Sequence, residues 1–545
     1  MKSFNYLALT LILGGAIALS LIQVASVFAV HVTTGVDVKV TNDNNNVDGG
    51  TPNPSFDAQD RQSNETSVAI SPVNSSIVAV GANDYRMATV FGDAWLGLYV
   101  SANGGAAWFN TMVPGFPSDT STAGLASPLL GLDGAGDPTV RFDAAGNLYA
   151  AGIAFNRDFD QQDLANDTVV FVAKYNYTPG TPPGVSTPNS AANPPNFTYA
   201  FTTIVDRGAV GFAIPSGSPF GFAGKLDDKS WMAIDRSLSS PCYGNVYYSF
   251  TKFTGVAGAH PIVLARSADG GATFSEPIPV SQKGQDGSLR TQGSYISVAS
   301  DGAVYVAYRT FQTSNPDRQS VQIVKSVDCG KHFGKTVVVG NLSAPQAPGV
   351  AFRTPTFAFV ANDDMNPNNV YVGYQHFAGD YDIYVQRSTD GGATWGSPVQ
   401  VNDDPGARHQ VFPTIGASNG VLHVAWYDFR NSTTAANEAL DVYYACTNCA
   451  GNSYPTFSHT SRVTDVSHNG SCLLFGGGTV AFHGDYIELA SRAGSSIGSS
   501  HTVHLAWADN RDVSPCDLDP APGPASNNTG NRNQNIYADT LIVAP

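Results

Sequence analysis

Short runs of alternating apolar and polar residues recur along the whole chain, and they come in pairs. The clearest pair is Phe412–Ser418 (FPTIGAS) and Val421–Arg430 (VLHVAWYDFR), joined by the turn Asn419-Gly420. A period of two in β-branched and aromatic residues predicts strands, and the Asn-Gly turn predicts an antiparallel hairpin. Comparable pairs lie at 66–82, 137–155, 230–250, 295–309, 354–375 and 486–509.

A distinctive eight-residue turn follows a further alternating strand in four of these units. It reads STDGGATW at Ser388–Trp395, SADGGATF at Ser267–Phe274, SVDCGKHF at Ser326–Phe333 and SANGGAAW at Ser101–Trp108. Asp or Asn can accept hydrogen bonds from turn amides, Gly supplies a positive φ, and the terminal aromatic ring anchors the turn. We call these segments the four box turns. Because one hairpin is not stable alone, their recurrence predicts a repeat architecture.

The number and size of the repeated units predict the fold class. Seven units of about 60 to 80 residues, each with four antiparallel strands, predict an all-β, seven-bladed β-propeller, with a six-bladed ring as the alternative. The last unit ends before its fourth strand. Val38–Asp43 (VKVTND) resembles Val399–Asp404 (VQVNDD), the outer strand of the fifth unit. Residues 36–41 should therefore complete the seventh blade and remove its open edge.

The two ends of the chain and two internal loops depart from the repeat. Residues 1–29 have the features of a signal peptide, with Lys2 before a long uncharged run and Val27-Phe28-Ala29 at the cleavage position. An uncleaved N-terminal anchor is the alternative, because the run is long enough to span a bilayer. Residues 36–545 should form one propeller domain, with long loop insertions at 112–133 and 176–226.

Composition narrows the setting in which the protein acts. The formal net charge of −16 argues against a nucleic-acid partner, because no basic stripe is present to neutralise phosphates. Six cysteines predict disulfides, with their pairing left open, and nine Asn-x-Ser/Thr sequons are compatible with glycosylation. We therefore expect a secreted, extracellular or cell-surface protein. It would contact a membrane only if the N-terminal segment stays uncleaved.

We expect no cofactor. Cys446-Thr-Asn-Cys449 resembles half of a zinc site, but no second pair at matching spacing completes it. The acidic loops Asn362–Asp364 and Asn402–Asp404 contain hard oxygen ligands that could hold a structural calcium ion. Neither loop has the ordered spacing of a known calcium loop, so solvated turns are the favoured interpretation.

The box turns resemble the Asp-box, or bacterial neuraminidase repeat, of sialidases and other secreted β-propellers. The resemblance implies that each box turn joins the two outer strands of a blade, on the face away from the active site. Its turn residues would then be structural, namely Asn103, Asp269, Asp328 and Asp390 with the aromatic residues Trp108, Phe274, Phe333 and Trp395.

The opposite face should carry any ligand site. Three second strands end in the same pattern there: Asp84-Tyr85-Arg86, Asp428-Phe429-Arg430 and Asp509-Asn510-Arg511. Ring closure would make these three blades neighbours, and an arc of three arginines would suit a carboxylate ligand. The alternative is that each Asp-x-Arg makes a salt bridge to the next blade and only locks the ring. Other polar residues at the starts of first strands or ends of second strands are Glu65, Asp137, Arg157, Lys229, Lys252, Arg290, Arg309, Arg353, Arg408, His409, Asp485 and Tyr486.

The sialidase resemblance implies a catalytic set that this chain matches poorly. Sialidases bind the sugar carboxylate with three arginines and attack with a tyrosine activated by a glutamate, while an aspartate acts as acid and base. The FRIP-like motif that carries the first arginine has its nearest match at Phe352-Arg353-Thr354-Pro355, in the fifth unit instead of before the first box turn. The catalytic candidates are Tyr486 or Tyr427 with Glu438 or Glu65, and Asp485.

Three functions remain open from the sequence. The first is a recognition propeller that binds a glycan or an extracellular protein through the arginine-bearing face. The second is a sialidase-like exo-glycosidase that uses the same arginines as a carboxylate clamp. The third is a purely structural extracellular or surface protein.

Overall fold

A computed structural model of the chain describes residues 32–41, 62–85, 94–156, 168–185, 190–208, 226–253, 260–281, 289–312, 315–355, 357–434, 437–449, 452–475, 480–494, 499–513, 516 and 533–544. The predicted signal peptide and Arg86 lie outside these residues.

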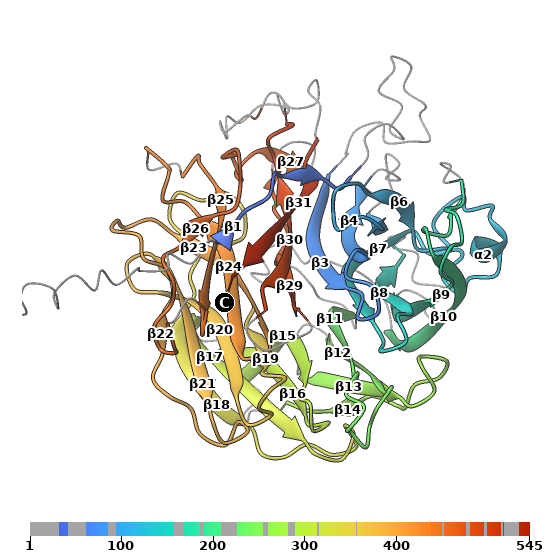
Figure 1. Cartoon of the computed structure of the whole chain (residues 1–545), viewed down its shortest axis with the longest axis horizontal. Coiled ribbons are helices and arrows are strands. Elements are labelled where there is room, and N and C mark those ends of the chain that lie inside the picture. The colour runs from blue at the N-terminus through green and yellow to red at the C-terminus, as the bar shows by residue number, and fades with distance from the viewer. Residues whose placement is uncertain are drawn as a thin grey trace, which may run out of the picture.

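Seven antiparallel sheets stand around a common axis, which confirms the seven-bladed β-propeller (Figure 1). The strands of the first six blades are as follows, from the axis outwards. Blade 1 is β3 (Ser63–Ile70), β4 (Val78–Asp84), β5 (Trp95–Ser101) and β6 (Phe109–Met112); blade 2 is β7 (Gly134–Phe142), β8 (Leu148–Phe155), β9 (Thr168–Tyr177) and β10 (Phe197–Gly208); blade 3 is β11 (Asp227–Ile234), β12 (Val246–Lys252), β13 (Ile262–Ser267) and β14 (Ile278–Pro279); blade 4 is β15 (Leu289–Val298), β16 (Val304–Gln312), β17 (Asn315–Ser326) and β18 (Val337–Ser343); blade 5 is β19 (Phe359–Asn362), β20 (Val370–Phe377), β21 (Tyr381–Ser388) and β22 (Val399–Gln400); blade 6 is β23 (Gln410–Ser418), β24 (Val421–Asp428), β25 (Asp441–Thr447) and β26 (Ser461–Arg462).

Blade 7 joins the two ends of the described chain. It contains β29 (Glu488–Ala493), β30 (His501–Asp509) and β31 (Asn535–Val543), and its outer edge is formed by β1 (Val32–Thr33) and β2 (Val38–Lys39). Val38 pairs with Ala538 and Lys39 with Tyr537, so the predicted closure by an N-terminal strand is confirmed. In Figure 1 the blue β1 lies beside the red β31. The N-terminal strand thereby covers a sheet edge that would otherwise be open.

The four box turns all connect the third and fourth strands of their blades. In each turn the serine Oγ accepts a hydrogen bond from a backbone amide four residues later, at 2.8 or 2.9 Å. The Asp or Asn Oδ1 accepts another from the amide four residues beyond itself, at 2.9 Å. Hydrogen bonds from Thr394 lower the pKa of Asp390 to about 2, so this carboxylate stays ionised as the acceptor of its turn.

Each box turn also contacts the preceding blade. The hydroxyls of Tyr149 and Tyr305 donate to the carbonyls of Gly270 and Gly391, both at 3.1 Å. The hydroxyl of Thr540 in blade 7 donates to Gly104 O in blade 1, at 3.3 Å. The box turn of blade 4 is instead joined to blade 3 by the disulfide Cys242–Cys329. The box turns therefore connect neighbouring blades as well as shaping their own hairpins.

The cysteines described by the structure are all paired, as Cys242–Cys329, Cys446–Cys449 and Cys472–Cys516. The expectation of disulfides is confirmed, and the zinc half-site of Cys446 and Cys449 is instead a local disulfide. Within the described ranges, no helix is both long and apolar enough to cross a membrane. The sequon residue Asn64 is fully buried and donates to Gln534, so a glycan could not attach there in the folded protein.

The two predicted insertions contain more regular structure than expected. The segment 112–133 includes the short helix α2 (Thr122–Leu125), capped by Ser121, and it buries Phe116 and Leu129. The segment 176–226 was expected to lack strands, but β10 lies inside it and forms the outer edge of blade 2. Pairing with the ten-residue β9 supplies the hydrogen bonds that make β10 a strand, although Pro- and Gly-rich segments flank it. A small hairpin, β27 (Leu473–Phe475) and β28 (Val480–Ala481), lies between blades 6 and 7.

Candidate functional site

The inner strands bring charged side chains to one end of the axis. The first strands of neighbouring blades contact one another around the ring, and each runs from the end where the second-to-third strand loops lie to the end of the box turns. We call these the loop end and the box end. Five inner strands have a register irregularity at corresponding positions near the loop end. Glu65, Asp137 and Lys229 occupy it with φ of 55°, 55° and 53°. Non-glycine residues adopt this backbone region at an energetic cost, and such strain is concentrated at functional sites.

A buried ion network surrounds Lys229. Its Nζ lies 2.6 Å from Asp485 Oδ2, 3.4 Å from Glu65 Oε1 and 3.4 Å from Asp137 Oδ1. Arg353 makes a two-pronged contact with Asp485, Nε to Oδ1 at 2.7 Å and Nη2 to Oδ2 at 2.5 Å. The carboxyl side chains are at most 8% exposed, whereas the Arg353 side chain is 48% exposed. We call Glu65, Asp137, Asp228, Lys229, Arg353 and Asp485 the axial cluster, and Arg353 is its outermost member.

The carboxyl groups of the axial cluster titrate in opposite directions. Burial raises the pKa of Glu65 well above its usual value, even though Lys229 opposes this effect. Burial and the negative charge of Asp137 raise the pKa of Asp228 to about 7. Burial also acts to raise the pKa of Asp485, but Arg353 and Lys229 outweigh it and lower the value to about 2. The cluster therefore holds protonated and ionised carboxyls together, as binding and catalytic sites often do.

We predict that the wild-type protein loses stability as the pH rises from 5.5 to 8, and that Asp228→Asn makes this loss smaller. The folded-state pKa of Asp228, about 7, lies above the unfolded value, so the folded state holds a proton that the unfolded state has released. Stability then falls as pH rises toward 7, by on the order of 2 kcal/mol for this group. Urea unfolding at the two pH values measures the effect, with the exposed Glu276→Gln as control. An unchanged pH dependence in D228N would show that Asp228 is already ionised in the folded protein.

A second guanidinium, that of Arg309, belongs to the neighbouring blade 4. Burial lowers the pKa of Arg309 to about 10; the charge of Asp485 opposes this effect and the charge of Arg353 adds to it. The Arg309 guanidinium lies 4.6 Å from the centre of the Phe357 ring, and its Nη2 donates to Gln292 Oε1 at 3.0 Å. Blades 4 and 5 thus each present an arginine at the loop end.

A second polar layer closes the axis below the cluster. The Glu488 carboxylate accepts from Arg141 Nη2 at 2.8 Å, from the Tyr295 hydroxyl at 2.7 Å and from the Ser67 hydroxyl at 2.6 Å. Arg141 also lies 5.3 Å from the centre of the Trp231 ring. Because its carboxylate is saturated by donors from three other blades, Glu488 holds the inner strands together and separates the loop end from the box end.

The five catalytic candidates are placed differently, and Glu65 lies in the axial cluster. Asp485 belongs to the axial cluster, and Tyr486 lies next to it but is buried, with its hydroxyl directed to Pro138 O at 3.4 Å. Burial raises the pKa of Tyr486 well above its usual value. Tyr427 donates to Ala508 O at 2.8 Å between blades 6 and 7. Glu438 accepts from Thr433 and Thr434 in an exposed loop, and the Thr434 hydrogen bond lowers its pKa to about 2.

Two of the three Asp-x-Arg sequences, those of blades 6 and 7, form ion pairs among the described residues. Arg430 Nη2 lies 2.7 Å from Asp428 Oδ2, and its Nη1 lies 3.0 Å from Asp403. Arg511 Nη2 lies 2.7 Å from both Asp509 and Asp37. Each guanidinium lies on a tyrosine ring, Tyr443 at 4.0 Å and Tyr537 at 4.1 Å. These contacts agree with the salt-bridge alternative, except that the first partner of each arginine is an aspartate of its own blade. In blade 1, Asp84 accepts from the Tyr99 hydroxyl at 2.5 Å.

The carboxylates of the two acidic loops act as acceptors within the protein. Asp363 accepts from the amide of Met365 at 2.9 Å, and Asp403 accepts from the amide of Thr460 at 3.1 Å and pairs with Arg430. Among the residues that the structure describes, no group of three or more His, Cys, Asp or Glu is placed to hold a metal ion.

Comparison with known proteins gives similarity in architecture only. No protein-family model matches the chain, and no curated protein matches it. Among solved structures, a Dyadobacter fermentans protein of unknown function is 15% identical, with a TM-score of 0.39, over 74% of this chain and 95% of that one. A Trypanosoma rangeli sialidase is 14% identical, with a TM-score of 0.40, over 70% and 54%. A Fusarium graminearum α-L-arabinofuranosidase is 12% identical, with a TM-score of 0.39, over 93% and 97%. Similarity this low carries no conclusion about the activity of this chain.

Proposed function

We propose that this protein is an extracellular recognition propeller that binds an acidic glycan at the loop end of its axis. The observation that supports the proposal most directly is the guanidinium of Arg353, whose side chain is 48% exposed and which Asp485 holds through Nε and Nη2. A guanidinium that is exposed and fixed in this way can bind a carboxylate or sulfate through charge-assisted hydrogen bonds. The three disulfides fit the oxidising setting that the proposal assumes.

The axial cluster would orient Arg353 for this role. Asp485 engages Nε and Nη2, and no described residue forms a hydrogen bond with Nη1, which leaves that nitrogen for the ligand. Asp485 also pairs with Lys229. Its single negative charge is therefore divided between two cations and does not fully neutralise Arg353. Burial acts to lower the pKa of Arg353, but Asp485 outweighs this effect and the pKa is raised. The guanidinium therefore stays charged at physiological pH.

Recognition is favoured over hydrolysis because the tyrosine at the axis is not presented to a ligand. Tyr486 is 4% exposed, and its hydroxyl is directed to a backbone carbonyl. A tyrosine nucleophile needs a hydroxyl that reaches the sugar and a carboxylate that takes its proton. Sialidase-like hydrolysis is therefore the second candidate function, and turnover of sialosides tests it.

We predict that Arg353→Ala weakens binding of acidic glycans by about 10- to 100-fold, the usual range for a lost charge-assisted contact. A glycan array with sialylated, uronic-acid, sulfated and neutral glycans would identify the ligand, and calorimetric titration would measure the affinity. Arg353→Lys, which keeps the charge but not the fork, should lose less. Arg462→Ala is the matched control, because Arg462 also pairs with a buried aspartate and is 36% exposed but lies in an outer strand.

Three outcomes would decide between the readings. Equal affinity of wild type and R353A, or no preference for acidic over neutral glycans, would overturn the proposed site. Turnover of fluorogenic sialosides by wild type but not by R353A would replace recognition by hydrolysis. Failure of every glycan to bind, with R353A stable, would favour the structural role.

A further inference from the structure

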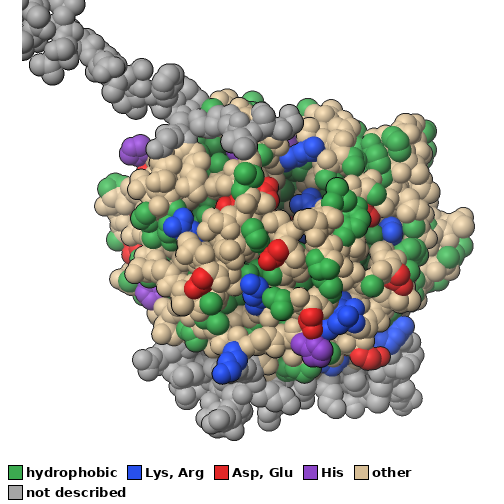
Figure 2. Space-filling model, turned by 60° about the horizontal axis from the view of Figure 1, so that its bottom comes forward, with side chains coloured by type: hydrophobic (Ala, Val, Ile, Leu, Met, Phe, Trp, Pro, Cys, Tyr) green, Lys and Arg blue, Asp and Glu red, His purple; other side chains and the backbone are tan. Residues whose placement is uncertain are grey.

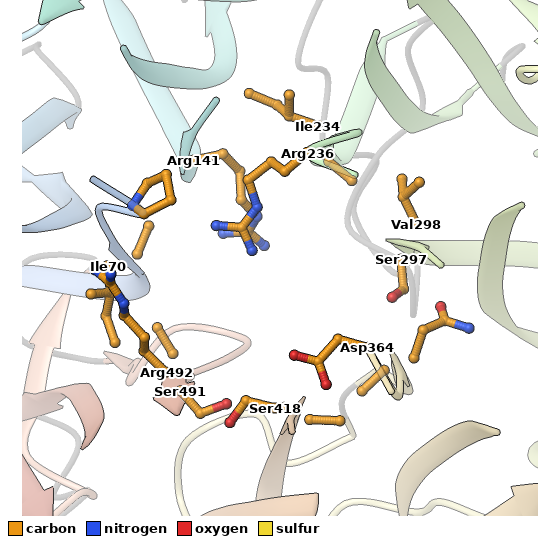
Figure 3. A pocket seen from close by; sticks show the side chains of 18 of the residues that line it. Ile70, Arg141, Ile234, Arg236, Ser297, Val298, Asp364, Ser418, Ser491 and Arg492 are labelled. Atoms are coloured by element: carbon orange, nitrogen blue, oxygen red, sulfur yellow. The ribbon is translucent and has the colours of Figure 1, made fainter. Parts of the chain in front are cut away.

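The box end of the axis contains a separate cavity. Its volume is 810 Å³, within the range of small-molecule sites, and it is lined by the ends of the inner strands and the turns that follow them. Arg141, Arg236 and Arg492, from blades 2, 3 and 7, all line it. In Figure 3 the side chains of Arg141 and Arg236 project into the cavity together, and Asp364 faces them from another wall. The layer around Glu488 separates this cavity from the axial cluster.

We propose that this box-end cavity is a second binding site, for a saccharide or similar polyhydroxylated molecule that carries one oxyanion. The site is independent of the proposed loop-end site: it uses different residues at the opposite end of the axis. Arg236 and Arg492 would bind the oxyanion, and Asp364, Asn362 and the serines of the walls would bind hydroxyl groups.

The cationic side of the site rests on Arg236. No described residue forms an ion pair or a hydrogen bond with its guanidinium, while Arg141 is paired with Glu488 at 2.8 Å. Arg492 donates to the backbone carbonyl of Ser71 at 2.6 Å and forms no ion pair within the described ranges. Two guanidinium groups without carboxylate partners thus line one cavity. Desolvation and repulsion by Arg141 and Arg492 lower the pKa of Arg236, while the charge of Asp364 acts to raise it. An oxyanion would reverse that repulsion.

The hydroxyl-binding side is formed by Asn362, Asp364 and the serines of the cavity walls. Both the nitrogen and the oxygen of the Asn362 side-chain amide are buried without a hydrogen bond to a described residue. Because protein encloses both atoms, the amide would have to turn toward the cavity to meet a ligand hydroxyl, and it would then gain the hydrogen bonds that it lacks. Asp364 accepts from the amide of Asn419 at 2.5 Å through Oδ1, and its Oδ2 can accept from a sugar hydroxyl. Ser297, Ser418 and Ser491 also line the cavity (Figure 3).

The rim of the cavity is held in place by a disulfide. Tyr243 lines the cavity and is 46% exposed. It follows Cys242, which is bonded to Cys329 in the box turn of blade 4. An exposed aromatic ring fixed beside a polar cavity can pack against the apolar face of a sugar. In contrast, the outer surface seen in Figure 2 carries acidic and basic side chains scattered singly among neutral ones, with no continuous basic area.

Arg236→Gln tests the inference, because no described contact of Arg236 is lost and the fold should be retained. Calorimetric titration would use glucuronate, N-acetylneuraminate, glucose 6-sulfate, inorganic phosphate and glucose as probes, with wild type, R236Q, R353A and the outer-strand control Arg266→Gln. We expect R236Q to weaken binding of the saccharide anions at one site by about 10-fold or more, and R353A and R266Q to leave that site unchanged. In thermal unfolding, glucuronate should stabilise wild type more than R236Q.

The outcomes separate this inference from the loop-end proposal. If R353A abolishes all anion binding while R236Q has wild-type affinity and stoichiometry, the box-end site is overturned and the loop-end site stands. If R236Q loses one site while R353A has no effect on any glycan, the reverse holds. Binding of inorganic phosphate as tightly as the saccharide anions would overturn the role of the hydroxyl contacts, and equal binding of glucose would overturn the role of the arginines.

Discussion

Lys229→Met should lower the free energy of unfolding by about 3–5 kcal/mol, the usual cost of removing one partner from a buried ion network. Among the described residues, Lys229 is the cation that pairs with Glu65 and Asp137, and it shares Asp485 with Arg353. Methionine fills a similar volume but leaves the carboxyl groups buried without their cation. The measurement is urea unfolding at pH 8 and pH 5.

The pH dependence distinguishes a lost charge from a packing defect. Without Lys229 the buried carboxyls would have still higher pKa values, so the folded state would bind protons that the unfolded state releases. The defect should therefore be smaller at pH 5 than at pH 8. Lys325→Met is the control: Lys325 lies 5.1 Å from the centre of the Tyr305 ring and donates to the carbonyl of Gly391, and it forms no ion pair with a described residue. A loss in K229M no larger than in K325M would contradict the network.

Arg430→Ala and Arg511→Ala should each lower the free energy of unfolding by about 2–4 kcal/mol, because each leaves a buried carboxylate without its cation. The side chains of Asp428 and Asp509 are 0% exposed. Each carboxylate also accepts from a tryptophan Nε1, Trp426 at 2.9 Å and Trp507 at 3.0 Å, so it cannot turn toward solvent without losing that bond. Arg408→Ala is the control, since Arg408 donates to Thr434 and Asn437 and forms no ion pair within the described chain.

The same variants test the ligand role first considered for these arginines. If Arg430 and Arg511 only hold the blades, R430A and R511A should be less stable but should bind acidic glycans as wild type does. Arg511 joins blade 7 to Asp37 at the start of β2, so R511A should also weaken ring closure. Stable variants that lose glycan binding would return the ligand site to this arc.

Much of the fold could be predicted from local patterns. The paired alternating strands, the four box turns and the similarity between residues 38–43 and 399–404 predicted seven blades and their closure, because period-two alternation and turn chemistry act over a few residues. The strand β10 was missed because Pro- and Gly-rich segments on both sides hide a pattern that only pairing with β9 makes evident. A strand at the edge of a sheet depends on its neighbour for its hydrogen bonds.

The candidate sites depended on long-range placement. The sequence showed Glu65, Asp137, Lys229, Arg353 and Asp485 near strand ends but not which of them meet. It missed Arg236 and Arg492 altogether, because both lie at the box end, where no ligand was expected. The inner strands share a register irregularity, and the side chain two positions before pairing resumes is turned toward the axis. The sequence pattern did not reveal this signal.

The sequence by itself determined most of the strands, the box turns and the seven repeated units, since each depends on residues close together in the chain. Only the tertiary structure decided which charges meet, because the ring brings together groups such as Ser67 and Glu488, 421 positions apart. Ion pairing and burial depend on distance in space and on exclusion of water. Neither quantity is written in a local pattern, so an arginine that binds an aspartate and one left for a ligand look alike until the blades close.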